Sequence, residues 1–234
     1  MTIGIYICYT YKKVMIEKEV YSDMNQYTIQ KNEFLYTDIK AYFNTYYVGY
    51  KKPNNPDFLN ELKNTFDNTP PAQLNAAVTS VYKKFVEDIP QIIRENNFNE
   101  CVLVGVPRSK AYSSYSPNQL LFNETIKKSC CDILKEVPFC TLLDGSKAII
   151  RFKNTKTTHI RKEINGFNND GDKPYPGITK ETCDFNTDLK GKNIVLIDDI
   201  YTKSVNIDED CIQALLDFGA KRVVFYSIGF TKTV

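Results

Sequence analysis

The chain has 234 residues, which is room for one α/β domain with an elaboration or for two small domains. Its 30 basic and 28 acidic residues give a net charge of +2, which does not indicate a nucleic acid or an anionic membrane as an obligatory partner. Apolar stretches stay below the roughly 18 residues of a membrane span. Seven cysteines without C-x-x-C spacing favour a reducing cytoplasm over a disulfide framework or a structural zinc site. We therefore expect a cytoplasmic protein.

The amino-terminal part, residues 1–72, is predicted to be an elaboration that could cover a site. Residues 1–23 alternate apolar and polar side chains, which is typical of an edge hairpin. Residues 33–48 carry apolar and aromatic side chains at helical spacing, and a second amphipathic helix is expected over 57–66. Consecutive prolines then break the chain, so we place the main α/β domain at 73–234.

The main domain alternates helical and strand patterns. A long helix is expected from Leu74, followed by a buried strand over 101–106 and another helix over about 118–135. Residues 141–152 resemble a hairpin or strand pair. Residues 153–183 have the composition of a long loop, which in a compact domain is usually functional or mobile.

The most informative stretch begins with a strand at 194–197 that runs directly into Asp198 and Asp199. A short polar loop, Thr202–Asn206, precedes apolar residues at helical spacing from Ile207 to Leu216. Gly219 then ends the helix, and a second buried strand follows at 223–228. Strand, loop, helix and strand form a βαβ unit, so we predict an α/β fold with a parallel sheet of four to six strands and helices on both faces.

This order of elements also predicts a ligand. In open parallel sheets, ligands bind beyond the carboxyl ends of the strands, where loop N–H groups and a helix N-terminus attract anions. Paired carboxylates beside an anion site suit hydroxyls or Mg²⁺. Asp198 and Asp199 next to Thr202–Asn206 therefore predict a site for a phosphorylated sugar. The other interpretation of the pair is a solvated turn after a buried strand.

This segment resembles the ligand-binding signature of type I phosphoribosyltransferases, in which a strand ends in Asp-Asp and the loop reads Thr-Thr-Gly-x-Thr. The matching positions are Asp198, Asp199 and Thr202, with Val205 at the variable position. The positions that depart from the second Thr, the Gly and the last Thr are Lys203, Ser204 and Asn206. A side chain at the Gly position either crowds the phosphate or turns away from it.

A second stretch follows the strand at 101–106. Arg108, Ser109 and Lys110 come directly after it, with Arg108 able to hold a pyrophosphate by its planar fork and Lys110 as a point charge. Taken alone, they could be solvated loop residues. In phosphoribosyltransferases the loop after an early strand binds pyrophosphate, and these residues occupy the corresponding place in chain order.

The resemblance is sharpest to the ComF-like branch of that family. Residues 115–119 keep the last two residues of an Arg-Gly-Phe-Asn-Gln segment. Residues 151–158 keep Arg151 and Thr155 of an Arg-x-x-x-Thr-x-x-Gln segment. The zinc-binding cysteine cluster with which such chains often begin is missing.

The segment after Arg151 resembles a mobile catalytic loop. His159, the single histidine, could donate a proton to leaving pyrophosphate or bind a phosphate oxygen. Lys153, Lys156, Arg161 and Lys162 would make this loop a cationic lid over a polyanion. A surface histidine in a solvated basic loop is the alternative.

The resemblance implies a Mg²⁺-dependent phosphoribosyltransferase whose donor is 5-phosphoribosyl 1-pyrophosphate (PRPP). Asp198 and Asp199 would bind ribose hydroxyls, directly or through Mg²⁺, and stabilise charge on the sugar. Thr202–Asn206 would hold the 5-phosphate. The alternatives are a sensor that binds PRPP or a nucleotide within a DNA-processing system, through a protein partner, and a ribose-phosphate hydrolase. Sixteen tyrosines make a homodimer a reasonable expectation. The acceptor is not predicted.

Overall fold

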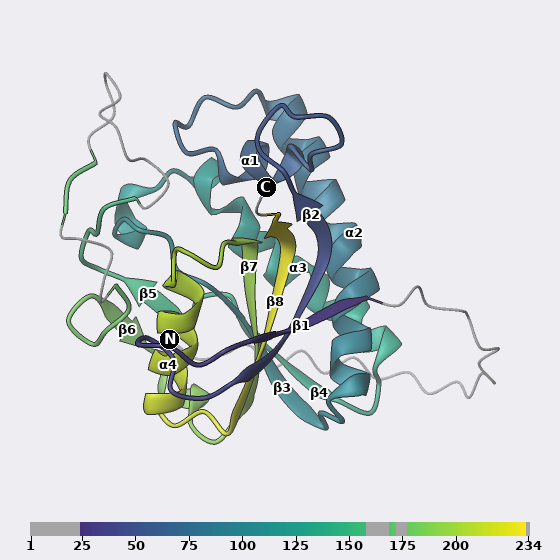
Figure 1. Cartoon of the computed structure of the whole chain (residues 1–234). Helices are drawn as coiled ribbons and strands as arrows, with labels where there is room; N and C mark the ends of the chain where they lie inside the picture. The colour runs from purple at the N-terminus through teal and green to yellow at the C-terminus, as the bar shows by residue number, and fades with distance from the viewer. Residues whose placement is uncertain (1–23, 158–168, 172–176, 233–234) are drawn as a thin grey trace.

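A computed structural model describes residues 24–157, 169–171 and 177–232. Its centre is a six-stranded sheet (Figure 1). In sheet order the strands are β1 (Asn25–Ile29), β2 (Ile39–Tyr47), β8 (Arg222–Thr231), β7 (Asn193–Tyr201), β3 (Glu100–Gly105) and β4 (Thr141–Gly145). Neighbouring strands are parallel from β2 to β4, and only the edge strand β1 runs antiparallel to its neighbour. The expected α/β class and mostly parallel sheet are confirmed.

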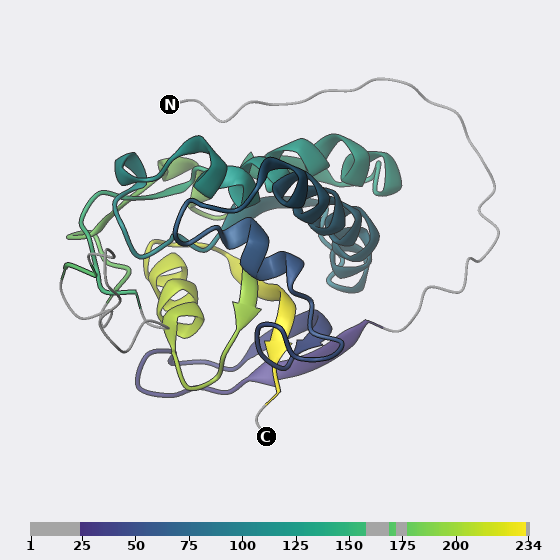
Figure 2. The same ribbon diagram turned by 90° about the horizontal axis from the view of Figure 1, so that it is seen from above.

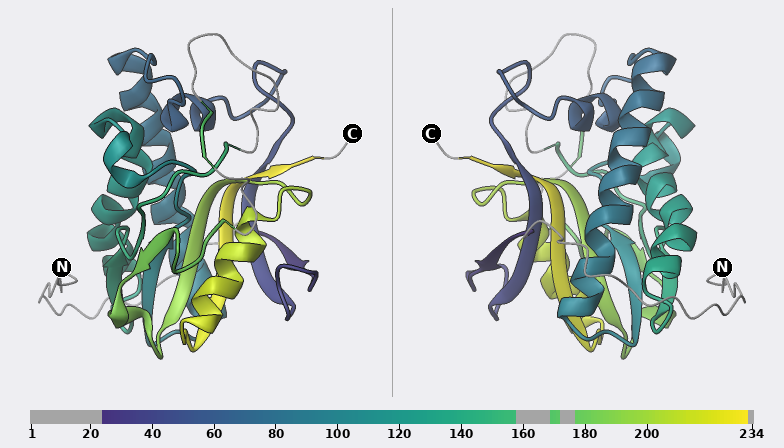
Figure 3. Two further views of the ribbon diagram at one scale, coloured as in Figure 1. Left: turned by 90° about the vertical axis from the view of Figure 1, so that its left-hand side faces the viewer. Right: turned by 90° about the vertical axis from the view of Figure 1, so that its right-hand side faces the viewer.

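Helices cover both faces of this sheet, as expected (Figures 2 and 3). The α-helices in the described part of the chain are α1 (Phe58–Lys63), α2 (Pro71–Glu95), α3 (Leu121–Glu136) and α4 (Ile207–Asp217). Short 3₁₀ helices span Tyr112–Ser114, Pro117–Leu120 and Thr187–Leu189. The first three α-helices pack on one face and α4 packs on the other, so each face has its own apolar core. None of these helices combines the length and apolar character needed to cross a membrane.

Several predicted elements are confirmed with small changes in their ends. The helices expected at 57–66, from Leu74 and at 118–135 correspond to α1, α2 and α3. α2 buries one stripe of its surface, including Val81, Phe85 and Ile89, because these side chains recur at helical spacing. Gly219 has a φ of +103° directly after α4, the left-handed conformation in which glycine ends a helix at low cost.

The helix predicted over 33–48 is wrong: this segment contains β2. Its aromatic residues fit a helical period, but β2 lies between β1 and β8 and is covered on both faces. Ala41, Tyr42 and Phe43 are consecutive and all buried, which requires apolar residues on both sides of the strand. Aromatic side chains also favour strands, so their helical spacing in this segment does not indicate a helix.

The prediction for 141–152 is correct in its strands and wrong in their pairing. β4 joins β3 in the central sheet, whereas β5 (Ile149–Arg151) pairs with β6 (Cys183–Phe185) in a separate two-stranded sheet. The hairpin expected at 1–23 lies outside the described residues. The described part of the expected elaboration contributes β1 and β2 to the central sheet, so the sheet itself continues across the boundary placed at residue 72.

The order of strands creates a crevice between β3 and β7. From β3 the chain passes through α3 to β4 on one side, and from β7 it passes through α4 to β8 on the other. Because the two connections leave in opposite directions and cover opposite faces, the carboxyl ends of β3 and β7 form a topological switch point. Ligands of open α/β sheets bind at such points.

Candidate functional site

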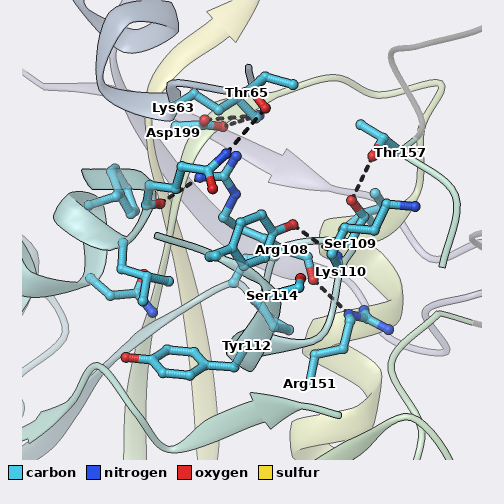
Figure 4. A pocket seen from close by; sticks show the side chains of 18 of the residues that line it. Lys63, Thr65, Arg108, Ser109, Lys110, Tyr112, Ser114, Arg151, Thr157 and Asp199 are labelled. Atoms are coloured by element: carbon cyan, nitrogen blue, oxygen red, sulfur yellow. Dashed lines mark hydrogen bonds and ion pairs between the residues drawn. The ribbon is translucent and has the colours of Figure 1, made fainter. Parts of the chain in front are cut away.

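A cavity of about 340 Å³ lies at this switch point. Residues after β3 line one side, the last part of β7 lines another, and the end of α1 closes over them (Figure 4). The wall also includes Tyr112, Tyr115 and Gln119 from the segment before α3. Two stretches that the sequence predicts to act together, 108–110 and Asp198–Asp199, are therefore brought into one cavity.

The two aspartates are held by the strand on which they lie. β7 continues to Tyr201, so they lie within the strand and not after its end. Each carboxylate accepts a hydrogen bond from the next backbone N–H, at 2.8 Å in both cases: Asp198 from Asp199, and Asp199 from Ile200. Successive side chains of a strand point to opposite faces. Asp198 accordingly faces the start of α4, and Asp199 faces α1.

Asp199 forms an ion pair with Lys63, the last residue of α1. The Lys63 ammonium is 2.9 Å from Oδ2 and 3.1 Å from Oδ1 of Asp199, and both residues line the cavity (Figure 4). Burial would lower the pKa of Lys63, but the charges of Asp199 and Asp198 outweigh burial and raise it. Lys63 is therefore a firmly charged ammonium inside the site.

Asp198 lies against a second buried carboxyl, Asp208, in the first turn of α4. Burial, and then the charge of Asp199, raise the pKa of Asp198 to about 7. Burial and Asp198 hold the pKa of Asp208 well above its ordinary value. Two buried carboxyls in hydrogen-bond contact, such as these, share one proton more readily than they both ionise. One oxygen of Asp208, Oδ1, is buried and has no hydrogen-bond partner.

Arg108 is the cation best placed to meet a ligand. Its guanidinium lies 4.4 Å from the centre of the Tyr115 ring, and Nη1 donates to the carbonyl of Gln119 at 2.5 Å. Stacking and one hydrogen bond fix the plane of the group. A fixed planar fork that lines a cavity suits a phosphate or pyrophosphate group.

Ser109, Lys110 and Arg151 line the cavity, but their polar groups mostly hold loops together. The Lys110 ammonium donates to the Thr155 carbonyl at 3.0 Å and is 3.1 Å from the Asp170 carboxylate. Ser109 Oγ is 2.8 Å from the hydroxyl of Thr157. Arg151 is buried and donates to the backbone carbonyls of Arg108 and Gly177. These contacts give Lys110 and Arg151 a positioning role.

The loop Thr202–Asn206 lies beside the cavity and does not line it; Ile207 does. Thr202 Oγ1 is 2.7 Å from Thr231 Oγ1, and the Lys203 and Ser204 side chains are exposed. The first turn of α4 carries three carboxylates of its own: Asp208, Glu209 and Asp210. Acidic side chains there already offset the positive charge at the start of the helix. We therefore expect α4 to attract an anionic ligand less strongly than its position after β7 suggests.

The remaining predicted site residues belong to the segment after Arg151. Lys156 is exposed and away from the cavity lining. His159 lies outside the described residues, as do Arg161 and Lys162.

The residues present provide part of a Mg²⁺ site, which a bound ligand and water would complete. No group of three or more His, Cys, Asp or Glu side chains with metal-binding geometry occurs in the described ranges. Mg²⁺, however, is commonly held by one or two carboxylates plus substrate phosphates and water. Asp198 and Asp199 provide two such carboxylates at the cavity wall.

Comparison with models of known protein families and with curated proteins found no match to this sequence. The case for a function therefore rests on the residues and their geometry.

The charged residues of the site that were not predicted from the sequence are Lys63, Asp208 and Asp170, the partner of Lys110. Lys63 ends a short amphipathic helix, and nothing in its local sequence distinguishes it from a surface lysine. Asp208 occupies a position where acidic residues are ordinary helix-start residues. Asp208 comes to lie beside Asp198 because α4 packs against β7, which is a property of the fold and not of the local sequence.

Proposed function

We propose that the protein is a Mg²⁺-dependent phosphoribosyltransferase that uses PRPP as donor and a nitrogenous base or similar nucleophile as acceptor. The observation that carries the proposal is the meeting of Arg108 with Asp198 and Asp199 in one cavity at the switch point of a parallel sheet. Cations for a diphosphate and carboxylates for a sugar or Mg²⁺ are the two halves of a PRPP site. The cavity volume of about 340 Å³ lies in the range of small-molecule sites.

In this proposal each group has a separate task. Arg108 binds the pyrophosphate, and Lys110 and Arg151 hold the loops that frame it. Asp198 and Asp199 hold ribose hydroxyls or Mg²⁺ and stabilise the positive charge that develops on the sugar as the C1–oxygen bond breaks. Mg²⁺, when bound, would neutralise charge on the leaving pyrophosphate. The acceptor nitrogen forms the new bond to C1 and loses its proton, and pyrophosphate leaves.

The role of Thr202–Asn206 in binding the 5-phosphate rests on the resemblance to the family signature. The loop directly follows the strand that carries Asp198 and Asp199, which agrees with that assignment. The acidic first turn of α4 argues for weaker phosphate binding than the signature implies.

A second candidate function is a sensor that binds PRPP or a nucleotide without turnover. The ion pair between Lys63 and Asp199 favours it, because a carboxylate already neutralised by lysine is a poorer ligand for Mg²⁺.

Release of pyrophosphate distinguishes the candidate functions. We expect pyrophosphate to appear when the protein, PRPP and Mg²⁺ are incubated with a panel of purine, pyrimidine and simple amine acceptors, and to stay at background without an acceptor. Pyrophosphate is measured by a coupled phosphate assay, with the Asp199→Asn variant as the blank. Binding of PRPP with no release from any acceptor would support the sensor, and release without an acceptor would indicate a hydrolase.

A further inference from the structure

Lys63 and a divalent cation require the same atoms. The ammonium contacts both oxygens of Asp199, at 2.9 and 3.1 Å, and Oδ1 additionally accepts the N–H of Ile200. The side of Asp199 that faces the cavity is therefore occupied by Lys63. A metal ion could bind Asp199 fully only if the ammonium moved away.

The structure fixes the backbone beneath Lys63 and leaves the side chain room to move. Asn64 ends α1 in a left-handed conformation, with a φ of 43°. The Gln119 side chain donates hydrogen bonds to the carbonyls of Asn64 and Thr65, at 3.1 and 3.2 Å. The backbone carbonyl of Gln119 accepts a hydrogen bond from Arg108, so the same residue connects the end of α1 to Arg108. The Lys63 side chain itself is 30% exposed and has four rotatable methylenes.

Lys63 and Arg108 face the same space. Arg108 is close enough to oppose the protonation of Lys63, and Asp199 is the carboxylate that offsets this repulsion. If Asp199 is taken by a divalent cation, two cationic side chains and a metal ion line one cavity. The positive charge of this arrangement is balanced by an anion with several negative charges, such as a diphosphate.

We propose that Lys63 exchanges partners when ligand binds: it neutralises Asp199 in the free protein, releases it to a divalent cation, and then binds an oxygen of the diphosphate. This inference rests on the proposed function, which supplies the diphosphate. It assigns Lys63 as a ligand-binding residue and explains how Asp199 remains neutralised in the empty site. It also predicts that metal and diphosphate bind together more tightly than either binds alone.

Two affinities test the exchange, one for a divalent cation and one for a diphosphate, and they are measured separately. Binding of Mn²⁺ without any donor is followed by electron paramagnetic resonance of the free ion, and binding of inorganic pyrophosphate at saturating Mg²⁺ is followed by calorimetry. Lys63→Met should bind Mn²⁺ about tenfold more tightly, because the competing cation is gone, and should bind Mg²⁺-pyrophosphate about tenfold more weakly. Lys63→Arg should keep the affinity for pyrophosphate without the gain in Mn²⁺ affinity.

Lys192 provides a matched control. It is 29% exposed and forms an ion pair with Glu100 at the opposite end of β7, so Lys192→Met removes a similar ion pair away from the cavity. We expect Lys192→Met to change neither affinity. Lys63→Gln is the second variant if Lys63→Met lowers the melting temperature.

Opposite shifts in the two affinities support the exchange. Unchanged affinities, or affinities that fall together with the melting temperature, would overturn it, because a purely structural ion pair predicts one of those results. If the wild-type protein binds neither PRPP nor Mg²⁺-pyrophosphate, the proposed function is wrong, and so is the proposed contact between Lys63 and the diphosphate. The Mn²⁺ measurement still decides whether Lys63 competes for Asp199.

Discussion

Asp199→Asn is expected to lower the affinity for PRPP in the presence of Mg²⁺ by about 100-fold, or roughly 3 kcal/mol. The substitution removes the charge of a cavity carboxylate and keeps its shape. The amide oxygen can still accept the N–H of Ile200, so the strand should remain intact. Calorimetry measures the affinity, and thermal melting checks the fold.

The loss should be confined to the Mg²⁺-dependent part of binding. Without Asp199, the Lys63 ammonium is unpaired beside Arg108, so pyrophosphate without Mg²⁺ should bind at least as well as it binds to the wild type. Asp198→Asn should also weaken Mg²⁺-dependent binding of PRPP, since Asp198 lines the same cavity. Normal PRPP binding by both variants would contradict the assignment of the site.

Asp208→Asn is expected to stabilise the protein at alkaline pH, by about 1 to 3 kcal/mol at pH ~8.5. The pKa of Asp208 is held well above its ordinary value and that of Asp198 is raised to about 7, in both cases first by burial. The folded chain therefore binds more protons than the unfolded chain above pH ~4. Its free energy of unfolding therefore falls as the pH rises from about 4 to these raised pKa values. Asparagine is neutral at every pH and can donate a hydrogen bond to Asp198.

Urea unfolding at pH ~5.5 and ~8.5 measures this effect. The difference between Asp208→Asn and the wild type should already be present at pH ~5.5, because the carboxyl is ionised in the unfolded chain and protonated in the folded chain at that pH. It should be larger at pH ~8.5. Asp184→Asn, on the exposed side of β6, controls for removal of a negative charge at the surface. An Asp208→Asn variant that is equally or less stable than the wild type at pH ~8.5 would show that Asp208 is not a buried, proton-sharing carboxyl.

The local sequence predicted the elements whose patterns have one clear physical cause. Four aliphatic residues before Asp198 predicted β7, and a helical apolar stripe predicted α2 and α4, because burial on one or both faces fixes these patterns. The length of β7 was missed. Carboxylates are poor strand formers, but β8 continues to pair beside them, with Ile200 opposite Gly229.

The charged groups of the site could be predicted only where they lie near or after the carboxyl end of a strand. Arg108 and Asp198 were found because the carboxyl ends of parallel strands meet at one edge of the sheet. Lys63 comes from a helix 136 residues away from Asp199, and only the tertiary fold brings the two together. The hydrogen bond of Lys110 to Thr155 and its ion pair with Asp170 also depend on how the loops pack. The sequence therefore predicted a cation at Lys110 but not the groups that it contacts.

Calorimetric titration of PRPP into the wild-type protein, with and without Mg²⁺, tests the central claim most directly. We expect saturable binding that requires Mg²⁺ and that is lost in Asp199→Asn, because Asp198 and Asp199 would hold the cation that neutralises the diphosphate. Absence of binding in both conditions would contradict a PRPP site. It would mean that this α/β fold, with the Lys63–Asp199 ion pair and with Lys203, Ser204 and Asn206 in the loop, binds a different ligand.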